Sequence, residues 1–395
     1  MKRGNCPVCG AAIPVQLEYR AAVPVFLNRL GNTVGEALAA SCGVLDIVGC
    51  RSCGFVWNRS FDPRLVPYDA EYENDQTHSQ AFREHMQEMA AKVLAAIPSD
   101  EPIDFVEVGC GQGTFLATFV ALAGSRLRNA VGFDPAFRSE HTITDPRIRV
   151  HKEFFNADTI ALLDAPPSLV VTRHTIEHVA DPGAFLSAIH AGLGRSRAHL
   201  FVETPDVNWI LDRHEIEDLF YEHCSLLAPV SMTVALAKAG FIPRKVESVF
   251  NGQYLWAEAT AGDETISLTP PPPPLFENLS GFAHQFVENW RSQIIRAKPA
   301  VVWGGAAKGV TFATLVDPDA TRIAALVDIN PAKQNKFVPI TGHRVVGPET
   351  LKSIRPKTVV VMNPNYRDEI ALELAKLKVD ANILVLGENG RSGLH

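Results

Sequence analysis

The sequence lacks a long apolar run, a basic stripe, a recognisable leader and an internal repeat. No apolar stretch approaches the length that spans a bilayer, so no membrane helix is expected. The formal net charge of -7 leaves no basic surface to neutralise phosphates, which disfavours a general nucleic-acid binder. No signal peptide is recognised ahead of the first cysteines, and we therefore expect a soluble, cytoplasmic protein in a reducing compartment.

Four of the seven cysteines stand in two matched pairs, C-P-V-C-G and C-R-S-C-G-F. This spacing lets one backbone turn point two thiolates at a single ion, and two such turns complete a tetrahedral shell. The pairs therefore predict a structural zinc site, with two disulfides or a redox C-x-x-C as the alternatives. Cys42 is the one competing cysteine, and we expect it to be buried. The predicted zinc ligands are Cys6, Cys9, Cys50 and Cys53.

Strand and helix patterns alternate twice along the chain, on either side of a proline-rich stretch. Buried strand patterns at residues 103–109, 130–134, 168–172 and 198–203 enclose helical patterns, an order that builds a parallel doubly wound sheet. A second, smaller alternation begins near residue 300. A helix is expected from about residue 79 to 97, and others at 114–123, 183–193, 231–239 and 276–298.

These patterns divide the chain, because 395 residues exceed one hydrophobic core. The predicted fold class is α/β: a Rossmann-like domain flanked by a zinc ribbon and a smaller Rossmann-like domain. We expect a zinc-binding domain at residues 1–66, a linking loop and helix at 67–98 and a cofactor domain at 99–268. A stiff linker, T-P-P-P-P-P-L at 269–275, then leads to a substrate-binding domain at 276–395.

A nucleotide-binding corner is predicted where the first buried strand ends. The sequence there reads E-V-G-C-G-Q-G-T-F, a strand followed by a glycine-rich turn and a helix start. About twenty residues later a second strand ends at Asp134, which is placed to accept hydrogen bonds from ribose hydroxyls. The geometry is shared with NAD enzymes, so the turn alone does not identify the ligand.

Two motifs in this region resemble those of class I S-adenosylmethionine-dependent methyltransferases. That family has an acidic and a hydrophobic residue before G-x-G-x-G, as here, and the stretch V-V-T-R-H-T-I-E-H-V-A-D-P resembles its fourth-strand motif. The resemblance implies S-adenosylmethionine as the cofactor, with His174 and His178 as wall and helix-start residues. The cofactor-binding residues that it implies are Glu107, Gly109, Gly111, Gly113, Asp134 and His174.

Almost the whole chain resembles the three-domain C-methyltransferases of nucleotide-linked 4-keto-deoxysugars, enzymes of natural product biosynthesis. The C-terminal matches are G-G-A-A-K-G, V-D-I-N-P-A-K-Q-N-K-F-V-P and P-I-T-G-H. The resemblance implies that Gly304, Lys308 and Asn330 contact the nucleotide of the substrate. The alternative is that this domain is only a scaffold and that its glycines serve a tight turn.

The catalytic candidates lie in F-Y-E-H-C-S, where the sugar enzymes read Y-H-E-H with the last histidine as general base. Glu222 and His223 match directly, whereas the family's tyrosine position holds Phe220 and a tyrosine follows at Tyr221. The family also uses a tyrosine from the segment before the cofactor domain. The candidates in that segment are Tyr68 and Tyr72, together with His78 as a further ligand contact.

These residue types suit methyl transfer to a carbon beside a ketone. Histidine can remove the acidic proton near neutral pH, a nearby carboxylate can orient the imidazole, and tyrosine or histidine donors can stabilise the enolate oxygen. The plain alternative is that residues 221–223 only begin a helix. Other functions that remain open are O- or N-methylation, methylation of a non-sugar metabolite, an NAD oxidoreductase that uses the C-terminal glycine turn, and a zinc-ribbon nucleic-acid adaptor.

Overall fold

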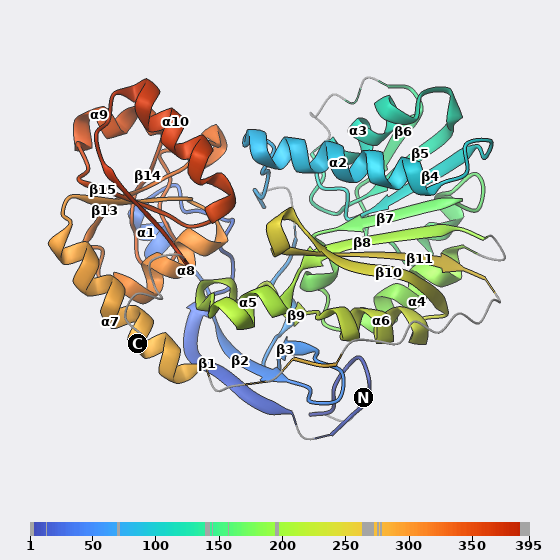
Figure 1. Cartoon of the computed structure of the whole chain (residues 1–395), viewed down its shortest axis with the longest axis horizontal. Helices are drawn as coiled ribbons and strands as arrows, with labels where there is room; N and C mark the ends of the chain where they lie inside the picture. The colour runs from blue at the N-terminus through green and yellow to red at the C-terminus, as the bar shows by residue number, and fades with distance from the viewer. Residues whose placement is uncertain are drawn as a thin grey trace.

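The computed structural model describes residues 4–12, 14–68, 72–138, 143, 145–156, 158–193, 197–262, 272–274, 276 and 279–387. Three sheets organise this part of the chain (Figure 1). Most of the predicted proline linker falls on residues that are not described. The α/β fold class is confirmed, with a Rossmann-like sheet at the centre, a smaller parallel sheet after it and a cysteine-bearing sheet before it.

The central sheet has the order β10-β11-β8-β7-β4-β5-β6. Neighbours from β6 to β8 run parallel, as predicted, whereas β11 and β10 add an antiparallel edge that the sequence patterns did not indicate. The strands are β4 (Ile103–Val108), β5 (Leu127–Phe133), β6 (Ile148–His151), β7 (Leu169–Arg173), β8 (His199–Pro205), β10 (Phe241–Val249) and β11 (Tyr254–Ala261).

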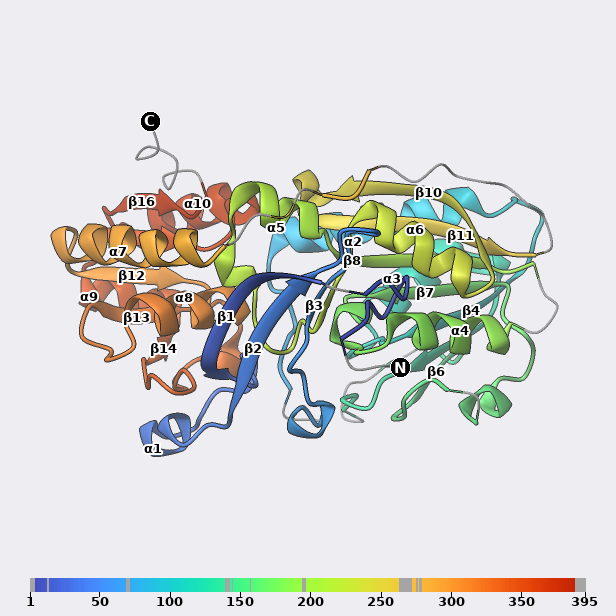
Figure 2. The ribbon, with the colours of Figure 1, turned by 90° about the horizontal axis from the view of Figure 1, so that it is seen from below.

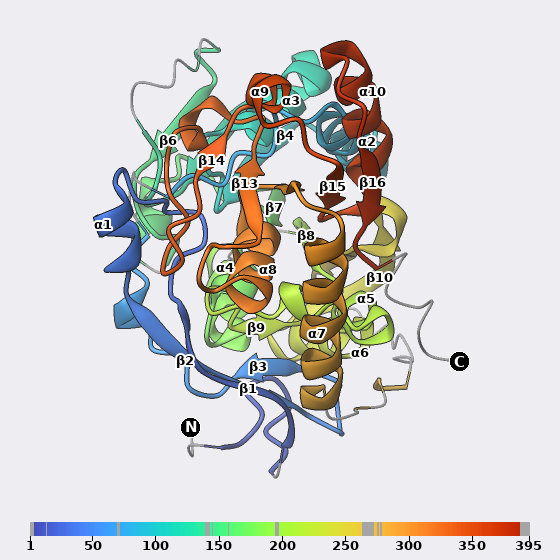
Figure 3. The ribbon, with the colours of Figure 1, turned by 90° about the vertical axis from the view of Figure 1, so that its left-hand side faces the viewer.

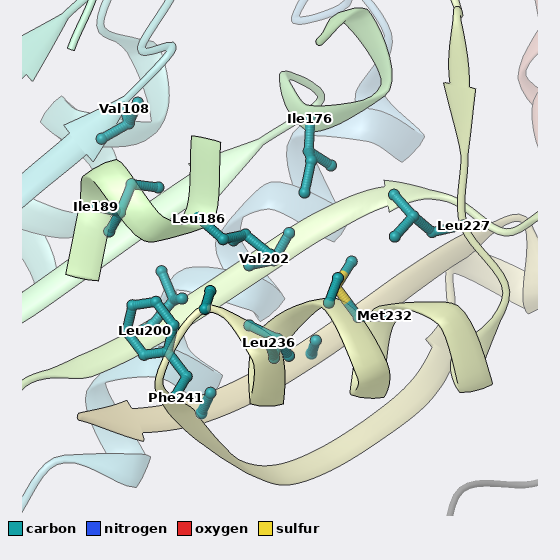
Figure 4. Close-up of a cluster of buried hydrophobic side chains, with 14 of the residues drawn as sticks. Val108, Ile176, Leu186, Ile189, Leu200, Val202, Leu227, Met232, Leu236 and Phe241 are labelled. Carbon is teal, nitrogen blue, oxygen red and sulfur yellow. The ribbon is translucent and has the colours of Figure 1, made fainter. Parts of the chain in front are cut away.

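Alternate residues of these strands enter two separate cores, because successive side chains point to opposite faces. Val106 and Val202 pack on one face with α4 (Pro182–Gly192) and α6 (Pro229–Lys238), as Figure 4 shows for the latter valine. Phe105 and Phe201 pack on the other face. That face is covered by α2 (Gln80–Ala96) and α3 (Thr114–Ala123).

The predicted helices form close to the expected bounds. The long helix expected from residue 79 is α2, and its first turn is capped by the Ser79 side chain, which accepts a hydrogen bond from the Phe82 N–H. The remaining helices are α1 (Val34–Leu38), α5 (Val207–Arg213), α7 (Ser280–Arg296), α8 (Ala307–Val316), α9 (Leu351–Ile354) and α10 (Arg367–Leu377). None of the helices in the described ranges is long and apolar enough to cross a membrane.

The N-terminal sheet includes one strand from a distant part of the chain. Its order is β1-β2-β3-β9, and all its pairs are antiparallel. The last strand comes from the segment that follows the central sheet's fifth parallel strand, so residues 225–226 tie the two sheets together. Figure 2 shows this sheet lying between the other two. Its strands are β1 (Val15–Pro24), β2 (Cys42–Gly49), β3 (Val56–Asn58) and β9 (Ser225–Leu226).

The C-terminal sheet is fully parallel, with the order β14-β13-β12-β15-β16. Figure 3 looks onto this part of the molecule, where α7 and α8 lie on one side of the sheet and α9 and α10 on the other. The strands are β12 (Ala300–Trp303), β13 (Ile323–Val327), β14 (Val345–Val346), β15 (Thr358–Val361) and β16 (Asn382–Val385).

Polar contacts join the C-terminal part to the rest of the molecule. Glu369 of α10 accepts hydrogen bonds from the Ser79 hydroxyl and the Gln80 N–H at the start of α2. Short 3-10 helices carry several other contacts. They are η1 (Pro63–Leu65), η2 (Gly124–Arg126), η3 (Thr159–Leu162), η4 (Ile176–His178), η5 (Ile216–Asp218), η6 (Phe250–Gly252), η7 (Pro331–Lys333), η8 (Pro348–Thr350) and η9 (Pro364–Tyr366).

Candidate active site

The four predicted zinc ligands come together in one cluster. The Sγ atoms of Cys6 and Cys53 are 3.6 Å apart, those of Cys9 and Cys50 are 3.4 Å apart, and all four lie within 4.8 Å of one another. These distances exceed the roughly 2.05 Å of a disulfide, and the cysteines are free. Zn–S bonds of about 2.3 Å in a tetrahedron place sulfurs roughly 3.8 Å apart, so the cluster fits zinc.

The two cysteine turns share one backbone design. Gly10 and Gly54 both adopt left-handed φ angles, +83° and +71°, and each donates its N–H to the carbonyl of the first cysteine of its pair. A residue with a Cβ is disfavoured in this conformation, which explains the glycine after each second cysteine. Cys42 lies outside the cluster and is exposed. The expectation that it is buried was wrong, because it begins β2 at the end of a surface loop.

A cavity of about 600 Å³ opens at the carboxyl ends of β4, β5 and β7. Its volume is within the roughly 300–1,000 Å³ of small-molecule sites. Ligands of open α/β sheets bind at this edge, beside the glycine turn. Residues 74–77 and α2 cover the cavity from the other side. Nearly the whole predicted cofactor set lines it: Glu107, Gly109, Gly111, Asp134 and His174.

The glycine turn leaves room for a ligand on bare backbone. Gly109 and Gly111 have φ angles of +73° and +54°; a Cβ on the first would lie 2.0 Å from the Thr175 hydroxyl, whereas one on the second would meet nothing within 4 Å. Gly113 does not line the cavity but precedes α3 with φ +79°. The turn therefore needs glycine for its conformation, and Gly111 faces open space.

Two carboxylates flank the turn. Asp134 accepts hydrogen bonds from the Gly111 and Ala136 N–H groups, both at 2.8 Å, and burial raises the pKa of its carboxyl. Glu107 is 2% exposed, and its Oε2 has no hydrogen-bond partner in the described ranges. Burial raises the pKa of Glu107 to about 8, although the charge of Arg173 acts in the opposite direction. An orphaned buried carboxylate beside a glycine turn fits the amino end of S-adenosylmethionine.

A second group of side chains joins the cavity at its far end. The Tyr68 hydroxyl oxygen is 2.7 Å from Nδ1 of His178, and both residues line the cavity. The same Nδ1 is 3.1 Å from the carbonyl oxygen of Glu222. A carbonyl oxygen can only accept, so Nδ1 carries the proton and the Tyr68 oxygen also accepts from it. The Tyr68 O–H is then free to donate elsewhere.

His223 lies behind His178, with the two ring centroids 4.9 Å apart. It is not among the residues that line the cavity, and the Phe220 ring packs 4.0 Å from it. Burial, with the neighbouring His178, lowers the pKa of His223 to about 3, although the Glu177 carboxylate acts in the opposite direction. His223 is therefore neutral at physiological pH, with a free lone pair on one ring nitrogen.

Glu177 is the carboxylate nearest to this histidine pair, and sequence reasoning missed it. A carboxylate oxygen of Glu177 and ring nitrogens of His178 and His223 all lie within 4.8 Å of one another. Burial alone would raise the pKa of Glu177, but the His174 hydrogen bond and the nearby histidines lower it to about 2. The signal was present in the quoted motif, where I-E-H places this carboxylate directly before His178.

Glu222 turns its carboxylate toward the N-terminal sheet. Its Oε2 accepts a hydrogen bond of 2.7 Å from the Leu27 N–H, and the Tyr72 hydroxyl lies beside the same carboxylate. Burial raises the pKa of Glu222 to about 7. Tyr221 lies outside the cavity lining, and its hydroxyl accepts a hydrogen bond from the Asp62 N–H. The structure thus brings Tyr68 and Tyr72 near His178, but not Tyr221.

The remaining predicted contacts lie away from the cavity lining. The Lys308 ammonium pairs with the Glu215 and Asp218 carboxylates, and the Asn330 amide donates to Glu73 at 3.0 Å. His78 pairs weakly with Asp75, at 3.9 Å, although its neighbours at 74–77 line the cavity. Gly304 directly follows β12 and has φ +129°. The side chains of Lys308, Asn330 and His78 are held by protein partners in this structure.

Comparisons with known proteins agree with this geometry. Residues 82–246 match a family model described as a methyltransferase domain, and residues 277–386 match one described as a C-methyltransferase C-terminal domain. No curated protein matches the sequence significantly.

Among solved structures, a SAM-dependent methyltransferase from Aquifex aeolicus is 15% identical, covering 48% of this chain and 100% of its own, with a TM-score of 0.35. The Burkholderia thailandensis 1,6-didemethyltoxoflavin-N1-methyltransferase is 15% identical, covering 47% and 82%, with a TM-score of 0.35. The N,N-8-amino-8-demethyl-D-riboflavin dimethyltransferase (RosA) from Streptomyces davawensis is 19% identical, covering 46% of this chain and 56% of its own, with a TM-score of 0.36. With its glycine corner and cavity inside the first family match, the chain is an S-adenosylmethionine-dependent methyltransferase with a C-methyltransferase C-terminal domain.

Proposed function

We propose that the enzyme methylates the carbon beside a ketone, on a nucleotide-linked 4-keto-deoxysugar, with His223 as the general base. One observation carries the proposal: the half-buried imidazole of His223 lies beside His178, whose contact with the Tyr68 hydroxyl is at the edge of the cofactor cavity. The C-methyltransferase C-terminal domain supports carbon as the acceptor atom.

The proposed step starts with removal of the proton from the carbon beside the ketone. The lone pair of the His223 imidazole takes this proton, and the electrons of the C–H bond pass to the ketone oxygen as an enolate. Burial holds the base neutral beforehand, and the ionised Glu177 stabilises the imidazolium afterwards. The low pKa of the free imidazole is offset in the complex, because the enolate charge forms beside it.

Tyr68 is placed to stabilise the enolate. Its oxygen accepts from His178, so its own hydrogen is free to donate to the developing oxyanion. Burial raises the pKa of Tyr68 well above its usual value, and the phenol therefore stays protonated as a donor. In our scheme Tyr72 and Glu222 lie behind Tyr68 and His178, and Tyr221 takes no part in the reaction.

S-adenosylmethionine, when bound, supplies an electrophilic methyl group whose bond to sulfur breaks as the new C–C bond forms. Glu107, the glycine turn and Asp134 would hold it, and His174 would form part of its wall. These residues would hold the cofactor against the sheet edge, which would leave the Tyr68 side of the cavity for the acceptor. Positioning of this kind supplies much of the rate in a transfer between two bound molecules.

We also propose that the four cysteines hold one structural zinc ion and that the boundaries predicted above separate three domains. A closed thiolate shell leaves no position for substrate, so the ion would stabilise the N-terminal sheet. Such thiolates persist in a reducing compartment, which agrees with the cytoplasmic location expected from the sequence. Metal analysis should give one zinc per chain; a metal-free, folded and active protein would contradict this assignment.

Carbon as the acceptor is tested by following a labelled methyl group. The enzyme would be incubated with methyl-¹³C S-adenosylmethionine and a panel of nucleotide-linked 4-keto sugars, and the products read by NMR. The proposal predicts a methyl signal coupled to a ring carbon, strongly reduced in His223→Gln and unchanged in the exposed control His284→Gln. A methyl signal on oxygen or nitrogen, or none across the panel, would support a different acceptor.

A further inference from the structure

Residues 72–77, which we call the cover segment, close one side of the cofactor cavity. Tyr72 and residues 74–77 line the cavity. Glu73 is not among the lining residues and is only 8% exposed, so its side chain points away from the cavity and into the protein. The position of this segment therefore sets how much of a bound cofactor is enclosed.

The Glu73 carboxylate is held from two sides. Its Oε2 accepts a hydrogen bond of 2.8 Å from Arg138, and its Oε1 accepts one of 3.0 Å from the Asn330 amide. Burial alone would raise the pKa of this carboxyl, but these two hydrogen bonds lower it, so Glu73 is ionised at neutral pH. Hydrogen bonds to an ionised group are stronger than those between neutral groups. Glu73 therefore anchors the cover segment firmly.

One of these two partners belongs to the cofactor corner. The Arg138 N–H donates to the Gln112 side chain at 3.0 Å, and the Gln112 amide donates to the Ala136 carbonyl at 3.1 Å. Gln112 is part of the glycine turn and lines the cavity. Through Arg138, the Glu73 carboxylate is thus connected to the turn that would carry the cofactor.

The other partner belongs to the C-terminal part of the molecule. Asn330 is 3% exposed, and its Oδ1 accepts a hydrogen bond of 2.9 Å from the Ala332 N–H in η7. This contact fixes the orientation of the amide, so its Nδ2 group faces Glu73. The Asn330 N–H donates to one oxygen of Asp328 at 2.8 Å, and the other oxygen accepts from the Gly305 N–H. Hydrogen bonds therefore join the glycine turn after β12 to the cover segment.

The C-terminal part makes a second set of contacts at the far end of the cover segment. The Tyr366 hydroxyl donates to the Gln76 side chain at 3.4 Å. Just beyond the segment, the Ser79 hydroxyl donates to Glu369 of α10 at 2.7 Å. The cover segment is therefore held near both of its ends by the same part of the molecule.

We propose that Glu73 and Asn330 are positioning residues that hold the cover segment over the bound cofactor, so that the C-terminal part controls how fast the cofactor leaves. The inference rests on the use of S-adenosylmethionine and needs nothing of the methyl acceptor. It gives the Asn330 side chain a partner within the protein in place of the nucleotide of the substrate. Breaking the contact between the two residues should favour an open segment and speed the release of the cofactor.

The test exchanges the two groups that meet. Glu73→Gln keeps an oxygen for Arg138 but turns an amide donor toward the Asn330 amide, which is also a donor. Asn330→Asp keeps the oxygen that accepts from Ala332 but places a second carboxylate against Glu73. The double variant Glu73→Gln/Asn330→Asp again pairs one amide donor with one carboxylate, at unchanged net charge.

The rate at which labelled S-adenosylmethionine leaves each protein would be measured by a chase with excess unlabelled cofactor. Each single variant should release it about 10-fold faster than wild type or more, as expected for one charged hydrogen bond, and the double variant should return to within about 3-fold of wild type. Asn382→Asp, the same substitution at an exposed position of β16, should leave the rate unchanged. Release at the wild-type rate in both single variants, or no recovery in the double variant, would overturn the proposal.

Unfolding in denaturant separates positioning from a purely structural role. If the pair of Glu73 and Asn330 only stabilises the fold, the single variants will unfold at lower denaturant while the release rate stays that of the wild type, which contradicts the proposal. If Asn330→Asp does not fold, the comparison of Glu73→Gln with the double variant decides alone. Failure to methylate any nucleotide-linked sugar would contradict the proposed acceptor and leave these release rates intact.

Discussion

The chain contains two glycine corners that share a hydrogen-bond pattern but have different surroundings. In the central sheet, Gly109 donates to the Phe133 carbonyl at 2.8 Å and the Gly111 N–H to Asp134 at 2.8 Å. In the C-terminal sheet, the Gly304 N–H donates to the Val327 carbonyl at 2.8 Å and the Gly305 N–H to Asp328 at 2.9 Å. Each corner joins a strand end, a glycine turn and an acidic residue that directly follows the next strand.

The two corners differ in the residues that cover them. The first opens onto the cavity, and a Cβ on Gly111 would meet nothing within 4 Å. At the second, a Cβ on Gly305 would lie 3.0 Å from Val345, and one on Gly309 would lie 1.7 Å from the Gly304 carbonyl oxygen. Lys308 next to it is anchored to η5. Two corners with the same hydrogen-bond pattern therefore differ in their surroundings: one opens onto the cavity, and the other is closely packed.

The largest effect should come from breaking the joint at the second corner. Lys308→Met leaves the Glu215 and Asp218 carboxylates without their ammonium, and removing one member of a buried ion pair costs about 3–5 kcal/mol. Denaturant unfolding should show this loss, whereas Lys352→Met, in an exposed pair with Glu349, should cost under about 1 kcal/mol. A stable Lys308→Met variant that has lost affinity for the nucleotide substrate would instead make this corner a ligand site.

The open corner should bind its cofactor in a pH-dependent manner. The pKa of Glu107 is about 8 in the free protein, so the group is mostly protonated at pH 7, but it must be ionised to receive an ammonium. Binding of S-adenosylhomocysteine should therefore release a proton below pH 8, and affinity should fall by at most about 10-fold for each pH unit below that value. Calorimetry in buffers of different ionisation enthalpy measures the proton release. A Glu107→Gln variant should show none, and a pH-independent wild type would contradict the assignment.

A matched pair of glycine substitutions sharpens the comparison further. Gly111→Ala places a methyl group in the cavity at φ +54°, which should cost about 1–2 kcal/mol of stability and weaken S-adenosylhomocysteine binding by about 10-fold. Gly305→Ala meets Val345 and Asp328 instead, so it should lower stability by a similar amount with cofactor affinity unchanged. Loss of cofactor affinity in the second variant would contradict the division of roles.

A smaller effect is expected where the two regions meet at the start of α2. Ser79 caps the helix and donates to Glu369 of the C-terminal part, and its replacement by alanine should cost about 1 kcal/mol. Thermal or denaturant unfolding of Ser79→Ala measures this cost. An unchanged midpoint would show that the cap and the contact with α10 add nothing to stability.

The sequence predicted features that are set by local backbone chemistry. The glycines after Cys9 and Cys53 and those of the cofactor turn need left-handed φ angles. These angles are set by the residues next to them in the chain, so the sequence alone can predict them. Buried strand runs and helix periodicity gave the parallel sheets and α2 near their observed bounds. Other features depend on distant partners. The pairing of β9 with β3 joins residues far apart in the chain, and nothing in either segment indicates it.

The side chains of the candidate site show the same division. His223 and Tyr68 were candidates from the family resemblance, but the direction of each side chain in residues 221–223 depends on the packing of the N-terminal sheet. Tyr221 therefore turned to the Asp62 backbone, and Glu222 to Leu27.

The most direct test of the proposed chemistry is proton exchange in heavy water without S-adenosylmethionine. Nucleotide-linked 4-keto sugars would be incubated with wild-type enzyme, His223→Gln and His284→Gln, and deuterium at the carbon beside the ketone measured by mass spectrometry and NMR. The account predicts incorporation with wild type and His284→Gln, and a loss of about 100-fold or more with His223→Gln. Equal incorporation by His223→Gln and the wild type would contradict His223 as the base. No incorporation by any of the three would contradict the 4-keto sugar as substrate.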